Sequence, residues 1–340
     1  MRILITRTDR LGDVVLSTPV IRLVRRTYPD AHIAFMVRPQ NRDAVMNNPD
    51  LDEVITYDKY GRHDGLGGTL KFSMFLRKKK FDTAIALHPT NRVHMILFLA
   101  GISRRIGYNK KMGWLLTQRV HYEKQLGEVH EAAYNLNLLE KAGFDIKDVD
   151  IRPYIRTTEE DKKLIDSVKK SSGLGDKIIA IHAGASCESK RWSLGMFSRV
   201  ADELSEKYHC DIVLVGGDET SEYSAAVMAD MKTRATDLTG TLLLGELAEL
   251  LSRTKLFISN DSGPVHVAVA VGAPVIAIFG RNDPGLSPKR WGPLGGKDIV
   301  LHKSPGCDPC LAHNCDKQFQ CLKAITVEDV IIAADKILNG

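Results

Sequence analysis

A strand–turn–helix junction between residues 256 and 271 restricts the fold of this chain more than any other segment. Residues 256–258 are apolar and predict a buried strand, and the Ala-rich run 267–271 predicts a helix. In the turn between them, Asp261 or Ser262 can cap the helix, and Gly263 lets a ligand approach the backbone. Pro264 suits the first helical turn, and His266 can add a further hydrogen-bond donor. Free N–H groups and a positive dipole end meet at such a turn, which predicts a diphosphate site.

A second junction of the same kind lies upstream. Residues 178–181 predict a strand, and a small-residue turn with Ala185 and Ser186 follows, then Lys190. A lysine side chain is a mobile point charge suited to a phosphate. Two anion-binding turns in one segment predict a nucleoside-diphosphate ligand. Because the protein itself supplies positive charge, we expect no divalent metal and no cofactor to be required.

Strand-like and helical runs alternate along the whole chain, which predicts an α/β fold with parallel sheets. The predicted strands are residues 3–6, 33–37, 54–57, 83–87, 178–182, 212–215, 257–259 and 275–279. A charged, extended segment separates the two halves, so we place a domain boundary between residues 155 and 175. At 340 residues, two doubly wound domains with a cleft between them are expected.

Charge is distributed unevenly between these halves. Residues 1–156 hold 26 Lys and Arg against 17 Asp and Glu, whereas residues 157–340 hold 21 against 25. The basic half predicts an anionic partner. No helix-turn-helix, zinc-finger or aromatic-interleaved basic motif favours nucleic acid, and anionic lipid or an anionic glycan fits equally well. No signal peptide and no apolar run of membrane-spanning length is present, so we expect a cytoplasmic protein.

Three separated motifs resemble glycosyltransferase family 9, the bacterial heptosyltransferases of lipopolysaccharide core assembly. They are residues 7–19, the stretches around Lys190 and from Asn260 to His266, and residues 279–284. The resemblance implies a GT-B fold, in which two Rossmann-like, doubly wound domains face each other across a cleft. It implies an acceptor-binding domain over residues 1–160 and a nucleotide-sugar domain over residues 175–322. In GT-B folds the terminal helix, here within residues 323–340, tends to cross back onto the N-terminal domain.

The resemblance implies inverting transfer of a heptose from ADP-heptose to a sugar hydroxyl of the lipopolysaccharide inner core. Such a transfer needs a base for the acceptor hydroxyl and positive charge for the departing ADP. Asp13 follows the first predicted strand at the edge where parallel sheets bind ligands, and is our predicted base. Asp9, in the same turn, is its nearest rival, and a helix-capping role for Asp13 is the structural alternative. Lys190 and the helix N-terminus would stabilise ADP.

The remaining site residues follow from strand ends and from the same resemblance. Glu222 is preferred over Glu219 for the ribose, and the resemblance places adenine near Leu242. The predicted donor-binding set is Ala185, Ser186, Lys190, Glu222, Leu242, Asp261, Ser262, Gly263 and His266. The predicted acceptor-binding set is Arg7, Arg10, Arg92, Arg105, Lys110 and Lys111. The implied partners are a nucleotide-sugar donor and an anionic, lipid-linked glycan, with peripheral contact to the inner face of the inner membrane.

Four cysteines are clustered late in the chain, with His302 and His313 close by: Cys307, Cys310, Cys315 and Cys321. Four thiolates within 15 residues can hold zinc or an iron–sulfur centre. The spacing is not that of a standard zinc ribbon, so a redox-linked pair and four unbridged cysteines stay open beside a structural metal. Cys187 and Cys210 stand alone and are expected to pack as small hydrophobic residues.

Three other functions compete with glycosyl transfer. A nicotinamide-dependent oxidoreductase typically has the motif Gly-x-Gly-x-x-Gly after its first strand, but the turn over residues 7–13 contains one glycine. A nucleotide-sugar epimerase on the same fold and a non-catalytic nucleotide-binding protein fit the junctions better. Within the transferases, the donor sugar, the position it is added to and the oligomeric state stay open.

Overall fold

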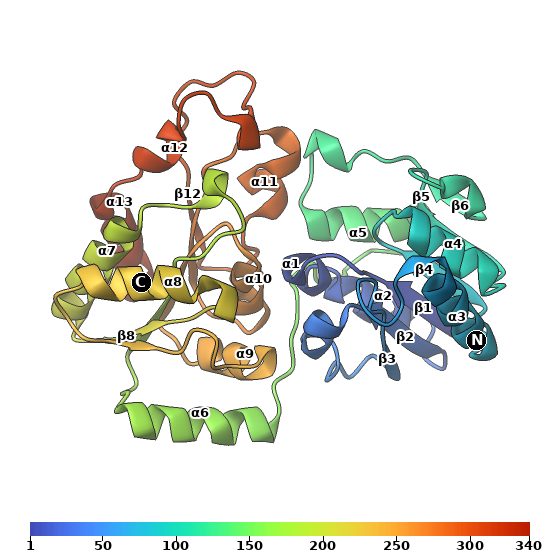
Figure 1. The fold of residues 1–340 in the computed structure, drawn as a ribbon, viewed down its shortest axis with the longest axis horizontal. Helices are drawn as coiled ribbons and strands as arrows, with labels where there is room; N and C mark the ends of the chain where they lie inside the picture. The colour runs from blue at the N-terminus through green and yellow to red at the C-terminus, as the bar shows by residue number, and fades with distance from the viewer. The chain divides into compact units, whose positions relative to one another are not determined.

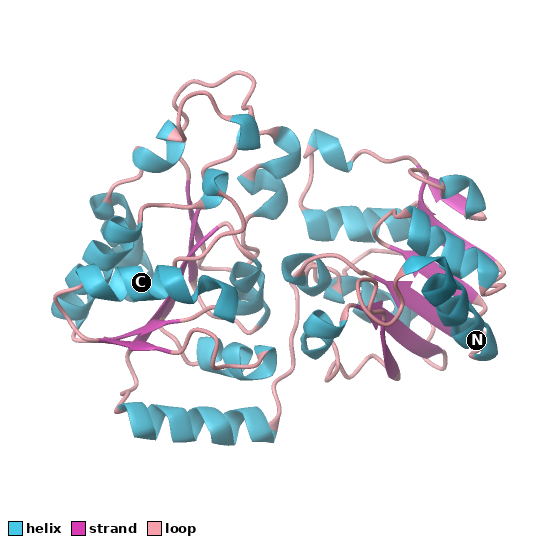
Figure 2. Ribbon diagram, viewed as in Figure 1, coloured by secondary structure: helices cyan, strands magenta, loops and turns pink.

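The computed structural model describes residues 1–340 and divides into two compact units. The first comprises Met1–Gln125 and Glu131–Ile155, and the second comprises Leu126–His130 and Arg156–Gly340. Each unit holds one six-stranded sheet in which all pairs of neighbouring strands are parallel, and helices connect the strands of both sheets (Figures 1 and 2). The predicted α/β class is therefore confirmed. None of the helices combines the length and the apolar content that crossing a bilayer requires.

The sheet of the first unit has the order β3-β2-β1-β4-β5-β6. Its strands are β1 (Arg2–Thr6), β2 (His32–Val37), β3 (Glu53–Thr56), β4 (Thr83–Ala86), β5 (Arg104–Tyr108) and β6 (Gln118–Val120). Its α-helices are α1 (Leu11–Val15), α2 (Thr18–Thr27), α3 (Gly65–Lys78), α4 (Asn91–Leu99) and α5 (Glu131–Glu140), and the 3-10 helices are η1 (Pro39–Ala44), η2 (Gly113–Leu115) and η3 (Lys124–Leu126). The strand order reverses between β1 and β4, so the loops after these two strands border a ligand-binding crevice.

The sheet of the second unit has the order β12-β11-β10-β7-β8-β9. Its strands are β7 (Ile178–His182), β8 (Asp211–Leu214), β9 (Ala235–Asp237), β10 (Leu256–Asn260), β11 (Val275–Ile278) and β12 (Ile299–Leu301). Its α-helices are α6 (Glu159–Ser172), α7 (Leu194–Tyr208), α8 (Ser221–Asp230), α9 (Leu244–Ser252), α10 (Gly263–Ala270), α11 (Pro288–Trp291), α12 (Gln320–Lys323) and α13 (Val327–Leu338). Four 3-10 helices complete the unit: η4 (Glu188–Lys190), η5 (Asp218–Thr220), η6 (Pro284–Leu286) and η7 (Ala312–Asn314). Here the order reverses between β7 and β10, where both anion-binding turns were predicted.

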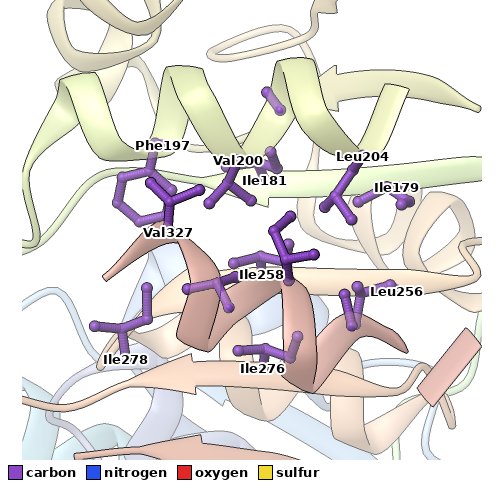
Figure 3. Close-up of a cluster of buried hydrophobic side chains, with 14 of the residues drawn as sticks. Ile179, Ile181, Phe197, Val200, Leu204, Leu256, Ile258, Ile276, Ile278 and Val327 are labelled. Atoms are coloured by element: carbon purple, nitrogen blue, oxygen red, sulfur yellow. The ribbon is translucent and has the colours of Figure 1, made fainter. Parts of the chain in front are cut away.

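The C-terminal helix α13 belongs to the second unit. Its apolar face, which includes Val327, Val330 and Ile337, is buried in the core of the second unit. Figure 3 shows Val327 beside Phe197 of α7, near apolar side chains of β7, β10 and β11. The helix begins at a capping box in which Thr326 and Asp329 exchange hydrogen bonds. Only three residues separate it from α12, so it packs on the nearest exposed apolar surface of its own sheet.

Candidate active site

The turn after β1 buries an arginine among three carboxylates. Arg7 is 2% exposed, and its Nε donates to Asp9 Oδ1 at 2.8 Å. Its other nitrogens donate to Asp13 and, at 3.0 Å, to Glu131 Oε1 on α5. A buried guanidinium needs compensating charges and acceptors for its five N–H groups. Arg7 therefore fixes the position of the carboxylates around it. Because its N–H groups are used by these partners, it has no group left to bind the acceptor substrate, which corrects its predicted acceptor-binding role.

Asp13 lies in the first turn of α1, with its side chain 14% exposed. Arg10, not Asp13, is the N-cap residue of that helix, so the carboxylate is not used for capping. The pKa of Asp13 is raised to about 6, because burial and the negative charge of Asp9 together outweigh the opposing charge of Arg7. A carboxylate with such a pKa is ionised at neutral pH and accepts a proton more readily than an ordinary aspartate.

A second buried layer supports Arg7 from α5. Lys124 Nζ donates to Glu131 Oε1 at 2.5 Å and to Asn135 Oδ1 at 2.9 Å. Asn135 also accepts from Arg7 at 3.1 Å and donates to the carbonyl of Leu16 at 3.2 Å, at the end of α1. The network therefore ties the turn after β1 to α5. Sequence reasoning missed Lys124, Glu131 and Asn135, because they lie more than 100 residues beyond Arg7.

A histidine that follows the neighbouring strand lies next to one of these carboxylates, that of Asp9. His88 follows β4, and its Nδ1 lies 3.2 Å from Asp9 Oδ2. The pKa of His88 is lowered to about 4, mainly by burial and then by the charge of Arg7. At neutral pH the ring is thus uncharged and can bond to Asp9 through an N–H. Its position directly after the predicted strand 83–87 was a signal that the sequence offered and that we did not use.

The predicted acceptor-binding cations are not equivalent in the structure. Arg105 donates from Nε to the carbonyl of Leu115 at 2.8 Å and from a second nitrogen to the carbonyl of Ile102, so it holds backbone together. Backbone carbonyls therefore occupy its guanidinium, which argues against the acceptor-binding role predicted for it. Arg92 donates to the carbonyl of Lys59 and contacts Asp64. Arg10, in the turn between β1 and α1, and Lys110 and Lys111, after β5, are exposed at the carboxyl edge of the sheet.

In the second unit, one buried amide joins the two predicted anion-binding turns. Asn260, the last residue of β10, accepts from the backbone N–H of Trp192 at 3.0 Å. Its Nδ2 donates to the carbonyl of Ala183 at 2.7 Å, just after β7. The chain that carries Lys190 is thereby fixed to the strand that leads into α10. The structure thus brings together the two junctions that the sequence predicted separately.

Two cations surround one carboxylate beside the start of α10. Asp261 Oδ1 lies 3.2 Å from Lys190 Nζ, and its Oδ2 accepts from Arg281 at 2.6 Å. Lys190 is 12% exposed, and burial lowers its pKa while Asp261 opposes that shift. Ser262 is the N-cap residue and Gly263 begins the helix. The arrangement has excess positive charge and free N–H groups at a helix N-terminus, which suits a diphosphate.

Arg281 is a site residue that sequence reasoning did not select. It lies three residues after β11, and its buried Nε has no hydrogen-bond partner within the protein. The segment 279–284 was noted only as part of a resembling motif, although an arginine after a strand at the carboxyl edge was a usable signal.

The other predicted donor residues lie around the same edge of the sheet. Ala185 and Ser186 follow β7, Glu222 is exposed in the first turn of α8, and Leu242 follows β9. His266 is buried inside α10, one turn after Gly263. The structure brings Lys190, Asp261, Ser262 and Gly263 together, whereas Glu222 and Leu242 lie after the outer strands β8 and β9.

The clustered cysteines line a cavity of about 300 Å³ with Arg281 on its wall. The structure contains all six cysteines as unpaired thiols, and it places no group of three His, Cys, Asp or Glu side chains around a common point for a metal ion. His313 lies in this loop, 3.1 Å from Ser189 Oγ through Nδ1 and 3.5 Å from Arg281 through Nε2. The cysteine loop therefore touches the cation pair at α10.

The chain is similar to known proteins over most of its length. The sequence profile of glycosyltransferase family 9 (heptosyltransferase) matches residues 69–320. The chain is 26% identical to lipopolysaccharide heptosyltransferase 3 of Escherichia coli K12, over 96% of this chain and 95% of that protein.

Solved structures agree with the fold as well. The crystal structure of a family 9 glycosyl transferase from Veillonella parvula is 28% identical, with a TM-score of 0.90 over 99% of this chain and 97% of that one. E. coli ADP-heptose lps heptosyltransferase II, at 24% identity, has the same fold with a TM-score of 0.83 over 100% and 99% of the two chains. The two parallel six-stranded sheets are those of the GT-B type. The chain is a glycosyltransferase with this fold and belongs to glycosyltransferase family 9, the heptosyltransferase family.

Proposed function

We propose that this enzyme transfers a heptose from ADP-heptose to a sugar hydroxyl of the lipopolysaccharide inner core, with inversion at the anomeric carbon. The observation that carries the proposal is the environment of Asp13, a carboxylate held by Arg7 in the turn after β1 with a pKa raised to about 6. The name of the E. coli relative supports a heptose and a lipopolysaccharide acceptor. The donor nucleotide follows the sequence resemblance.

In the proposed reaction, Asp13 takes the proton of the acceptor hydroxyl as its oxygen attacks the anomeric carbon. The new C–O bond forms on the face opposite the departing ADP, so the configuration inverts. Arg7 keeps the carboxylate ionised and oriented, and Glu131 holds Arg7. A base of this kind contributes about 10²-fold or more to the rate.

The departing ADP gains negative charge as the glycosidic bond breaks. Lys190, Arg281 and the N-terminus of α10 supply fixed positive potential at one point, where it is most effective in a partly buried site. We therefore propose that transfer requires no divalent metal. Glu222 would bind the ribose hydroxyls, and backbone near Leu242 would contact adenine.

The two units would accordingly divide the substrates between them. The second unit would bind the nucleotide sugar, and the first, with its basic sequence, would bind the phosphorylated glycan. Arg10, Arg92, Lys110 and Lys111 are the proposed acceptor contacts that remain once Arg7 and Arg105 are set aside. We place the reaction in the cytoplasm, at the inner face of the inner membrane, where a lipid-linked acceptor is available.

The test is transfer from ADP-heptose to a heptose-deficient lipopolysaccharide, followed by ADP release and by mass spectrometry of the glycan. Asp13→Asn should lower turnover about 100-fold or more while ADP still binds. The control is Asp30→Asn, an exposed aspartate in the turn before β2. Turnover of Asp13→Asn above a tenth of the wild-type rate would contradict the assignment of the base. Interconversion of ADP-heptose without acceptor would instead indicate an epimerase.

A further inference from the structure

Helix α3 of the first unit exposes an apolar face that the proposed reaction does not use. Leu66, Leu70 and Met74 follow one another at four-residue spacing, and they are 81%, 52% and 56% exposed. The opposite side of the helix is also apolar, since Phe72 and Leu76 are buried in the core of the unit. Residues four apart lie on one side of a helix. Three large apolar side chains therefore form a continuous stripe in contact with solvent.

The neighbouring helix also exposes a large apolar side chain. α3 packs against α4 (Figure 1), and Phe98 near the end of α4 is 50% exposed. A Cβ atom at Gly101, just beyond α4, would lie 4.0 Å from Arg77 Nε on α3, so the ends of the two helices lie together. Contiguous exposed apolar groups, such as the stripe on α3, mark an interaction surface more often than scattered single ones do.

Positive charge borders the stripe. Lys71, Arg77 and Lys78 are exposed on α3, and the run Lys79–Lys80 follows it. Residues 65–80 contain no aspartate or glutamate. We call Leu66, Leu70, Met74, Lys71, Arg77 and Lys78 together the α3 surface. It combines the two properties by which a helix binds in the plane of a charged bilayer, an apolar face and flanking cations without acidic residues.

We propose that the α3 surface binds an anionic lipid bilayer, with Leu66, Leu70 and Met74 inserted below the headgroups and the three cations against lipid phosphates. The apolar side chains gain by leaving water, and the cations gain from the negative surface potential. Residues 65–80 offer basic and no acidic side chains, so the charge of the α3 surface is complementary to anionic lipid headgroups. The inference deepens the proposed function, because it brings the first unit to the surface where a lipid-linked acceptor is anchored.

The test is co-sedimentation of the full chain with vesicles, without donor or acceptor. One set of vesicles is phosphatidylcholine alone, and the other is phosphatidylcholine mixed with phosphatidylglycerol. The test variant carries Leu66→Gln, Leu70→Gln and Met74→Gln, which keep good helix formers at exposed positions. The matched control carries Leu164→Gln, Met228→Gln and Ile332→Gln, three exposed apolar residues on helices of the second unit.

The wild-type chain and the control should sediment with the anionic vesicles and not with the neutral ones, and added salt should weaken the binding. The test variant should lose about tenfold or more of its partition onto anionic vesicles, with thermal unfolding unchanged. Lys71→Gln with Lys78→Gln should weaken binding most at low salt. Equal binding of the test variant and the wild type would overturn the proposal, and so would equal binding to both vesicle types. A change in the mass of the free protein in the test variant would overturn it in favour of a second copy on this surface. Because no transfer is measured, these outcomes are independent of whether ADP-heptose is the donor.

Discussion

Asp9 and Asp13 both accept hydrogen bonds from the guanidinium of Arg7. Removing the charge of Asp9 tests which of the two carboxylates is the base. Asp9→Asn leaves an amide of the same shape beside Arg7. Burial and the charge of Asp9 are the two largest causes that raise the pKa of Asp13 from 3.8 to about 6. Removing the charge of Asp9 should therefore lower the pKa of Asp13 toward its ordinary value of 3.8.

The pH dependence of kcat/KM reports the ionisation of the free enzyme's base. A lower pKa keeps the base ionised at lower pH, so the acidic limb of the profile moves toward acid. At pH 5 the wild type should retain roughly a tenth of its plateau value of kcat/KM, and Asp9→Asn a clearly larger fraction of its own plateau. The assay is initial-rate ADP release between pH 4.5 and 8.5, at subsaturating substrate.

Two results would refute the reasoning. Loss of activity in Asp9→Asn at every pH would make Asp9 the base, because Asp13 is intact in that variant. An unchanged acidic limb would show that Asp13 does not respond to the charge of Asp9. Asp30→Asn, which removes an aspartate remote from the turn after β1, should keep the wild-type profile.

Four further outcomes are expected. Asp13→Asn should stabilise the protein toward urea at pH 7 by up to about 3 kcal/mol, because the raised pKa means that the folded state disfavours the ionised carboxyl. The gain in the free energy of unfolding should grow as the pH rises from 4 through 6 and be absent below pH 4. A gain that does not vary with pH would contradict this prediction. Arg281→Gln should weaken ADP binding about tenfold in calorimetry, as should Lys190→Gln, and an unchanged affinity would remove Arg281 from the site. Arg105→Ala should lower the melting temperature and leave the KM for the acceptor unchanged, since its guanidinium bonds to backbone carbonyls; the reverse pattern would restore its acceptor role. Excess EDTA should leave the rate of transfer unchanged, and a rate that recovers only with Mg²⁺ would refute the proposed stabilisation of ADP.

The sequence was sufficient for the parts of the fold that are local and strongly apolar. All eight predicted strands exist, within one or two residues at each end. The strands that were missed are β5, β6, β9 and β12; three of these contain only three residues, and β5 contains two arginines. Such segments become strands because a neighbouring strand pairs with them, and this cannot be seen in their own apolar pattern.

The same division holds for the candidate site. Asp13, Asp9 and Lys190 were found because each follows a recognisable strand. Glu131 and Lys124 were not found, because a buried ion network is defined by partners that are distant along the chain. Arg7 was found but misassigned, since an arginine in a polar turn looks exposed until its carboxylate partners are placed around it.

The side-chain amide of Asn260 also bears on when the donor site can exist during folding. It closes contacts to residues 68 and 77 positions earlier in the chain, at Trp192 and Ala183. Contacts between residues so far apart form late, because the intervening chain must first lose its freedom. The lysine turn and the α10 turn therefore become one site only when β7 and β10 have paired. Binding of ADP then reports completed assembly of this sheet, and partly folded chains should gain no protection from the nucleotide.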